Sequence, residues 1–218
     1  MMVYRLVIFI FGLACLVAAP GRIEAHPHIW VTMTEELVYS PDGSVTGLRQ
    51  TWTFDDMFSV FVTQGIEQKT RGAFTPEELE PLAKTQVESL KEYAYFTYAK
   101  FDGKPQKDAF VDPVDYFLDY DSKETVLTFH FTLPFKVPVT AKSLQLEVYD
   151  PEFFTYFNFA KTDPVRLIGA PAQCSVSVEK PHDDNASTTL GFDRSLMTSE
   201  ANAGMGAAFA KQISVKCL

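Results

Sequence analysis

Most of this chain is a succession of short segments rich in β-branched and aromatic residues, separated by clusters of Pro, Asp and Gly. Such segments predict β-strands joined by tight turns. The first two, at residues 28–39 and 44–53, flank Ser40-Pro41-Asp42-Gly43 and predict a hairpin. Asp102-Gly103 predicts a second hairpin turn. The remaining strands are predicted at 95–101, 116–120, 125–133, 143–149, 154–159 and 173–179.

A first helical pattern follows the first hairpin. Thr53 and Asp56 have the spacing of a capping box, which predicts a helix with Thr53 as its N-cap. Phe58, Phe61 and Val62 then follow at helical spacing.

A second helix is predicted from Thr75-Pro76-Glu77-Glu78, which combines an N-cap residue, a proline in the first turn and an acidic residue three positions on. Pro81 is expected to kink this helix or to delay its start by one turn. The fold class that follows is α+β: an antiparallel β-sheet or sandwich with two helices inserted after the first hairpin.

The first 25 residues have the order of a secretory signal peptide. Arg5 supplies the positive start, residues 6–19 are almost continuously apolar, and Ala25 supplies a small residue for cleavage. The apolar run is shorter than the roughly 20 residues that span a bilayer, so an uncleaved anchor is the less favoured alternative. We therefore expect a periplasmic protein whose mature chain does not span the membrane, with residues 26–181 forming one α+β domain.

Cleavage would remove Cys15 and leave two of the three cysteines, Cys174 and Cys217. Two cysteines in an exported protein predict a disulfide, with two free thiols as the alternative. Residues 182–218 are rich in Ser, Thr, Asn, Ala and Gly in their first part. This composition predicts a flexible tail with one short helix near 207–212, tied back to the last strand by the disulfide.

Composition excludes several classes of protein. Aromatic residues make up 14% of the chain, which excludes disorder throughout. The formal net charge of −9 argues against a nucleic-acid-binding surface, which needs a basic stripe. The chain has no nucleophile elbow, no P-loop and no dinucleotide fingerprint, so these motifs point to no enzyme class.

The strongest candidate site is the new amino terminus, His26-Pro27-His28. It offers an α-amine and two imidazoles within three residues, and imidazole is the commonest protein ligand for zinc, copper and nickel. Pro27 removes a backbone N–H, so a square-planar site built from deprotonated amides cannot form there in the usual way. A frayed polar terminus is the alternative.

Two carboxylates beside aromatic residues could complete a mixed nitrogen and oxygen site. Asp55 lies next to Asp56 at the predicted helix start, where helix capping is the alternative explanation. Asp150 lies near Glu152 between two predicted strands, where an Asp-Pro turn would also explain it.

Two further histidines lie in less specific surroundings. His130 lies between Phe129 and Phe131 on a predicted strand, and a hydrogen-bonded structural histidine is favoured there. His182-Asp183-Asp184 could bind a metal, but a solvated acidic turn is favoured.

These residues together resemble a known family. His26-Pro27-His28-Ile29-Trp30, the block Thr51-Trp52-Thr53-Phe54-Asp55 with Phe58-Ser59 after it, and Val148-Tyr149-Asp150-Pro151 are similar to a bacterial family of unknown function. Its members are described as the periplasmic component of an uncharacterised ABC-type transport system. They are often encoded beside nickel/cobalt-type permeases, and some are implicated in zinc acquisition. The resemblance covers residues 26 to about 180 and matches His26 and His28; it implies a role in periplasmic metal handling.

The leading hypothesis is therefore a periplasmic divalent-metal-binding accessory protein, for zinc first and nickel or cobalt next, that assists an inner-membrane metal permease. One alternative is a secreted copper enzyme in which His26 and a distant histidine chelate the ion for oxidative chemistry. Another is a structural or docking subunit of a transporter that binds no metal.

Overall fold

The computed structural model describes residues 27–179 and 206–217. The signal peptide predicted at 1–25, together with His26, His182, Asp183 and Asp184, lies outside these residues. The helices are α2 (Asp56–Val62) and α3 (Pro76–Lys91), with 3₁₀ turns η1 (Ala94–Phe96) and η3 (Gly206–Phe209). The strands are β1 (Ile29–Tyr39), β2 (Val45–Phe54), β3 (Thr97–Phe101), β4 (Lys104–Gln106), β5 (Val114–Asp121), β6 (Val126–Val139), β7 (Ser143–Val148), β8 (Thr155–Phe159), β9 (Val165–Ile168), β10 (Cys174–Glu179) and β11 (Lys211–Cys217).

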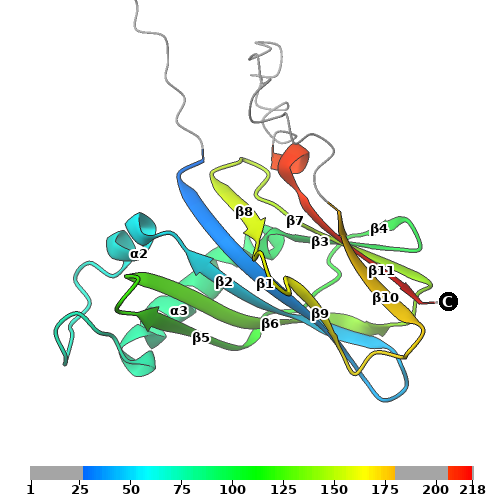
Figure 1. Ribbon diagram of the computed structural model, residues 1–218, viewed down its shortest axis with the longest axis horizontal. Helices are drawn as coiled ribbons and strands as arrows, with labels where there is room; N and C mark the ends of the chain where they lie inside the picture. The colour runs from blue at the N-terminus through cyan, green and yellow to red at the C-terminus, as the bar shows by residue number, and fades with distance from the viewer. Residues whose placement is uncertain (1–26, 180–205, 218) are drawn as a thin grey trace, which may run out of the picture.

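The strands form two sheets, and the α+β prediction with two helices after the first hairpin is confirmed (Figure 1). The larger sheet has the order β5-β6-β2-β1-β8, and β9 also pairs with β1. The smaller sheet has the order β10-β11-β7-β3-β4. Pairing is antiparallel except that β8 and β9 run parallel to β1.

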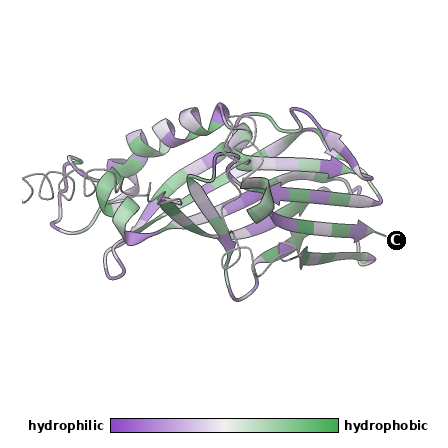
Figure 2. Ribbon diagram, turned by 90° about the horizontal axis from the view of Figure 1, so that it is seen from above, coloured by the Kyte–Doolittle hydropathy of each residue, from purple (hydrophilic) through white to green (hydrophobic). Residues whose placement is uncertain are grey.

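The inner face of the larger sheet is covered by two different layers. One half packs against α3 and η1, through Val31, Trp52, Leu79, Phe96 and Phe129 among others. The other half packs against the smaller sheet and joins two sets of residues. These are Leu37, Tyr39, Val45, Leu48, Phe135 and Val139 from the larger sheet, and Ala99, Leu144, Leu146, Ile213 and Val215 from the smaller one. Figure 2 shows α3 over one half of the fold and the smaller sheet at the other. The molecule therefore has two hydrophobic cores that share β1, β2 and β6.

The amino terminus of α2 differs from the predicted capping box. Thr53 is in β2, where its hydroxyl lies 3.0 Å from that of Thr128 on β6. The N-cap is Asp55, whose Oδ1 accepts the N–H of Phe58 at 2.8 Å. The prediction of Thr53 as N-cap was wrong because β2 continues one residue further than predicted, to Phe54, which pairs with Val31 on β1.

The amino terminus of α3 follows the prediction. The Thr75 hydroxyl accepts the Glu78 N–H, and the Glu78 carboxylate accepts the Thr75 N–H, so the capping box is complete. The helix begins at Pro76 and is continuous through Pro81. Pro81 therefore does not delay its start.

The strand predicted to begin at residue 95 begins at Thr97. Ala94, Tyr95 and Phe96 instead have φ values of 51°, 54° and 51°. A left-handed backbone costs roughly 1–2 kcal/mol for each non-glycine residue, so the surrounding packing must hold this turn. Tyr95 and Phe96 are both buried, and the Tyr95 hydroxyl donates to Asp112 at 2.9 Å. The Asp102-Gly103 turn also has positive φ at both residues, as the predicted hairpin requires.

The carboxyl-terminal residues correct the predicted domain boundary. Residues 206–217 are not a tail: β11 lies between β10 and β7 in the smaller sheet, where Ile213 and Val215 are buried. The short helix expected near 207–212 is η3 at Gly206–Phe209. A strand that is interior to a sheet belongs to the domain, so the domain extends past residue 181 to this strand.

No helix in residues 27–179 and 206–217 is long and apolar enough to cross a membrane.

The predicted disulfide is present. Cys174 and Cys217 are paired opposite each other in the β10–β11 ladder, with their Cα atoms 4.1 Å apart and a sequence separation of 43. Because the bridge closes a long loop, removing it frees many conformations of the unfolded chain.

We expect the Cys174→Ser/Cys217→Ser double variant to unfold with a free energy lower by about 4 kcal/mol, the chain-entropy value for a loop of this length. Urea unfolding of the oxidised protein, the reduced protein and the double variant measures this difference. Reduced protein and double variant should agree. A reduced protein as stable as the oxidised one would contradict the prediction.

Candidate metal-binding site at the start of β1

His28 stands on the surface immediately before β1. Its backbone N–H donates to the carbonyl of Phe154 at 2.8 Å, and its ring lies 4.8 Å from the Phe154 ring. The residue is exposed and Pro27 before it is half-buried. The fold therefore fixes the backbone of His28 and leaves the imidazole at the surface.

Asp55 is fixed beside the start of β1 by two hydrogen bonds. Besides capping α2 through Oδ1, it accepts the backbone N–H of Trp30 on Oδ2 at 2.8 Å. The carboxylate is half-exposed. Each oxygen accepts one N–H and keeps a further lone pair, so the carboxylate can cap the helix and still coordinate a cation.

Asp150 has a structural role in the turn before β8. Its Oδ1 accepts the N–H of Glu152 and its Oδ2 accepts the N–H of Thr155, both at 2.9 Å. The residue is only 4% exposed. Asp150 therefore sets the start of β8, and through it the position of Phe154 against His28.

The fold brings the candidate residues to one end of the larger sheet. Val31 pairs with Phe54 on one side of β1, and Ile29 pairs with Thr155 on the other. Asp55 and Asp150, which are far apart in sequence, thus flank the strand that begins next to His28. Within residues 27–179 and 206–217, no three His, Cys, Asp or Glu side chains are grouped closely enough to hold a metal ion.

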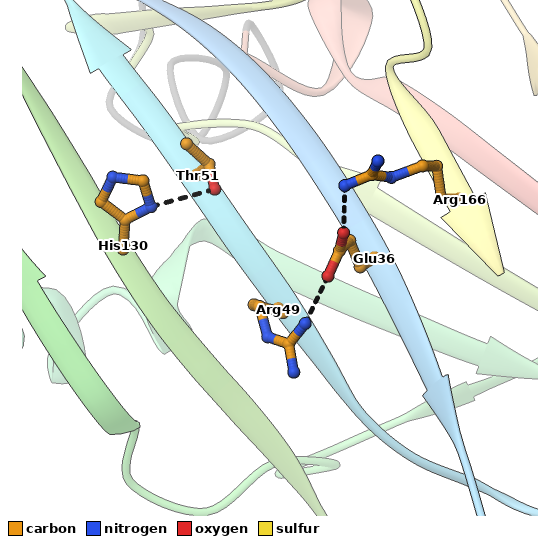
Figure 3. A network of polar contacts seen from close by, with 5 residues as sticks. All are labelled: Glu36, Arg49, Thr51, His130 and Arg166. Atoms are coloured by element: carbon orange, nitrogen blue, oxygen red, sulfur yellow. Dashed lines mark hydrogen bonds and ion pairs between the residues drawn. The ribbon is translucent and has the colours of Figure 1, made fainter. Parts of the chain in front are cut away.

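His130 is on the outer face of the larger sheet, away from this end. Its Nε2 lies 3.2 Å from Asp119 Oδ2, its Nδ1 lies 3.3 Å from the Thr51 hydroxyl, and its ring stacks on Phe117. Burial lowers the pKa of His130, and the Asp119 carboxylate opposes that shift. Figure 3 shows the imidazole pointing from β6 toward Thr51. These contacts agree with the structural histidine favoured from the sequence.

The same face carries an ion-pair network across three strands. Glu36 on β1 accepts hydrogen bonds from Arg49 on β2 and Arg166 on β9 (Figure 3). Both arginines are more than half exposed. Exposed pairs of this kind contribute little stability, so we assign the network to strand register and solubility.

Glu35 is a buried ionisable residue that the sequence reasoning missed. It is 1% exposed, and neither carboxylate oxygen has a hydrogen-bond partner among the described residues. Gln50 pairs with it across the β1–β2 ladder, but the Gln50 side chain already bonds Thr97 and Trp52. Burial raises the pKa of Glu35 well above its usual range. The nearby Trp52 indole N–H, which donates to Gln50, lowers this pKa only in part.

The strand pattern could have found Glu35. Inward positions of β1 alternate as Val31, Met33, Glu35, Leu37 and Tyr39, so a carboxylate stands where every other side chain is apolar or aromatic.

With this geometry established, comparison with known proteins places this α+β molecule in a family of unknown function. The chain belongs to the family described as protein of unknown function DUF1007, whose match covers residues 11–217. It is also similar to an uncharacterised 15.5 kDa protein from the region 3′ of trpE in Spirochaeta aurantia, with 33% identity over 101 residues. That similarity spans 44% of this chain and 66% of the relative.

We expect Glu35→Gln to change how stability depends on pH. Above the ordinary glutamate pKa the unfolded chain loses a proton that folded Glu35 retains. The free energy of unfolding therefore falls as pH rises, by up to about 1.4 kcal/mol per pH unit until the folded pKa is reached. Glutamine cannot ionise, so the stability of the variant relative to the natural protein should increase from about pH 4.5 upward.

Urea unfolding at a series of pH values measures this difference. Glu36→Gln, on the opposite face of the same strand, is the matched control and should not gain relative stability in this way. Parallel pH profiles for Glu35→Gln and the natural protein would show that Glu35 does not control this pH dependence.

Proposed function

We propose that this protein is a periplasmic divalent-metal-binding accessory protein that supplies an inner-membrane metal permease. Zinc is the first choice of ion, with nickel or cobalt next. The observation that carries the proposal is the position of His28. It stands exposed at the start of β1, and the Asp55 carboxylate is held two residues along by the Trp30 N–H.

The chemistry of these donors suits zinc. After cleavage at Ala25, His26 would add an imidazole and an α-amine to the His28 imidazole, and Asp55 would add an oxygen ligand. Mixed nitrogen and oxygen donors are usual for zinc, which takes four ligands in tetrahedral geometry. A site at the molecular surface lets ligands exchange, as delivery of an ion to a second protein requires.

Asp150 has a supporting role in this site. It is buried, and it accepts the N–H of Thr155, the first residue of β8, directly after the Phe154 that contacts His28. We therefore assign Asp150 to positioning and Asp55 to coordination, which narrows the ligand set expected from the sequence.

The disulfide supports an oxidising compartment. Such bonds persist in secreted and periplasmic proteins and are rare in the bacterial cytosol. The Cys174–Cys217 bridge is thus consistent with export by the predicted signal peptide. The resemblance of the three sequence blocks to a periplasmic transport component supports the same location and the permease as partner.

We expect the mature protein, secreted with native His26 at its terminus, to bind one of Zn(II), Ni(II), Co(II) or Cu(II) tightly in calorimetric titrations. The His26→Ala/His28→Ala variant should lose that binding. Asp55→Asn should weaken it at least about tenfold, since losing even an outer-shell partner of a metal site costs about that much. Asparagine is as good an N-cap as aspartate, so this variant keeps the cap of α2. It removes the charge and also the acceptor for the Trp30 N–H, because the asparagine amide nitrogen cannot accept a hydrogen bond.

His130→Ala is the control. His130 lies on the outer face of the larger sheet, away from the candidate site, so this substitution should leave the affinity unchanged. Cu(II) binds most nitrogen and oxygen sites more tightly than the other three ions, so its affinity alone does not separate the alternatives. Peroxide-driven oxidation of a polysaccharide by the copper-loaded protein, lost in His26→Ala, would favour the oxidative-enzyme alternative. Unchanged binding in the His26/His28 variant would refute the proposed site. Absence of binding to any of the four ions would favour the docking-subunit alternative, for which exposed Trp30 and Met57 at this end provide an apolar surface.

A further inference from the structure

A pocket of about 200 Å³ lies between the two sheets, at the end of the fold opposite the candidate metal site. His28 precedes the first residue of β1, whereas the pocket is lined by Tyr39, the last residue of that strand. Its walls come from the β1–β2 turn, the β6–β7 connection and the β9–β10 connection, together with the Cys174–Cys217 disulfide. Figure 1 shows the β1–β2 turn and the β9–β10 connection at the lower right, far from the start of β1.

The pocket has an apolar base and a polar rim. The base is formed by buried side chains from both sheets, which are Tyr39, Val45, Val139, Leu144 and Val215. The rim carries three exposed polar side chains, which are Asp42, Thr140 and Gln173. Because the rim is exposed, water satisfies its polar groups. A molecule that fits this pocket therefore needs an apolar body and a polar end that stays at the rim.

The Tyr39 hydroxyl is the polar side-chain group at the base. Tyr39 is 8% exposed, and its hydroxyl has no hydrogen-bond partner among the described residues. A buried hydroxyl without a partner lowers the stability of the fold. Burial also raises the pKa of Tyr39, so the phenol keeps its proton at neutral pH. The base therefore offers a hydrogen-bond donor to an acceptor atom of a bound molecule.

Asp42 is a fixed negative charge at the rim. Its Oδ1 accepts hydrogen bonds from the Ser40 hydroxyl and from the N–H and hydroxyl of Ser44, the last two at 3.0 and 2.7 Å. These bonds, first that from Ser40, lower the pKa of Asp42 to about 2. Its Oδ2 accepts none of them, and among residues 27–179 and 206–217 Asp42 forms no ion pair. The ionised carboxylate thus presents Oδ2 to a cation.

The walls of the pocket are set before anything binds. Gly43 has a φ of 83°, and a Cβ atom at this position would lie 3.1 Å from Pro171 Cγ. The β1–β2 turn thus packs directly on the β9–β10 connection. The disulfide joins β10 to β11 at the same end. A binding site whose walls are already in place costs less free energy to fill than one that must first be ordered.

The volume limits the size of the bound molecule. A cavity of about 150 Å³ lined by aliphatic and aromatic side chains holds one benzene ring. A pocket of about 200 Å³ therefore has room for one ring and a few further atoms.

We propose that this pocket binds a small organic cation, an amine with a body the size of one ring. Its ammonium group bonds Asp42 Oδ2 at the rim, and an acceptor at its other end receives the Tyr39 hydroxyl proton. The site shares no residue with the candidate metal site, so this inference does not rest on the proposed function.

Tyramine is the probe, because it combines one ring, an ammonium group and a hydroxyl at the opposite end. The methyl resonances of Val45, Leu144 and Val215 are followed by NMR during the titration. We expect saturable shifts with tyramine and weaker binding of phenethylamine, which lacks the hydroxyl. 3-(4-Hydroxyphenyl)propionate, which has a carboxylate in place of the ammonium, should not bind. Binding of this anion as tightly as tyramine would overturn the assignment of a cation.

Two conservative variants test the two polar contacts separately. Tyr39→Phe should weaken tyramine about fivefold, the effect of one hydrogen bond, and leave phenethylamine unchanged. Asp42→Asn keeps Oδ1 for the turn and should weaken both amines about threefold or more, as loss of an ion pair near the surface does. Asp121→Asn is the matched control, because Asp121 also accepts backbone N–H groups in a turn but lies between β5 and β6. It should leave both affinities unchanged.

The absence of saturable binding of either amine would show that the pocket holds only water and would overturn the proposal. Equal tyramine affinity in the natural protein, Tyr39→Phe and Asp42→Asn would place the amine elsewhere and would also overturn it. Failure of the natural protein to bind metal, with tyramine binding retained, would refute the proposed function and leave this inference standing.

Discussion

Strand β1 is paired along its whole length, and both cores and the candidate site depend on where it places its side chains. It bonds β2 on one side, and on the other it bonds β8 over its first half and β9 over its second. Its inward residues contribute to both cores, with Met33 in the helical one and Leu37 in the one between the sheets. Its first residue follows His28 directly. A shift of one residue in its register would turn every inward side chain outward and would also remove Trp30 from Asp55.

Glu35 lies on β1 at the junction of these two cores. Here β8 has ended and β9 begins, and the Glu35 N–H donates to Pro164 in the connection between them. Opposite Glu35, Gln50 is fully buried and bonds Thr97, which starts β3 in the other sheet. The seam between the cores is thus polar, and its Gln50–Thr97 hydrogen bond joins the two sheets at a defined position. Burying the Glu35 carboxyl without a hydrogen-bond partner lowers the stability of the fold. The apolar cores on both sides of Glu35 hold the carboxyl in this position.

The sequence patterns succeeded where structure is decided locally. The Thr75–Glu78 capping box, the Asp102-Gly103 turn and the alternation of β1 depend on residues a few positions apart, and each was predicted. Thr53 was assigned to the wrong role because β2 continues to Phe54, which pairs with Val31 on another strand. β11 was missed because its neighbours β7 and β10 come from distant parts of the chain, and β9 because it is a short parallel edge strand. His28, Asp55 and Asp150 could be selected from the sequence because their side chains are common metal ligands. That Asp55 and Asp150 flank the strand next to His28 follows only from the order of strands β2, β1 and β8.

The hydrogen bonds of Asp55 also determine how an ion at this site would act on the fold. The carboxylate holds the first turn of α2 and the start of β1 together through its two oxygens. A cation on the remaining lone pairs adds a contact without replacing either N–H, so the cap and the metal site are compatible. Because the unfolded chain does not bring His28 and Asp55 together, ion binding to the folded state stabilises it in proportion to the logarithm of the free ion concentration over the dissociation constant. The segments that a bound ion would stabilise are α2 and the first residues of β1, because the Asp55 carboxylate accepts one backbone N–H from each.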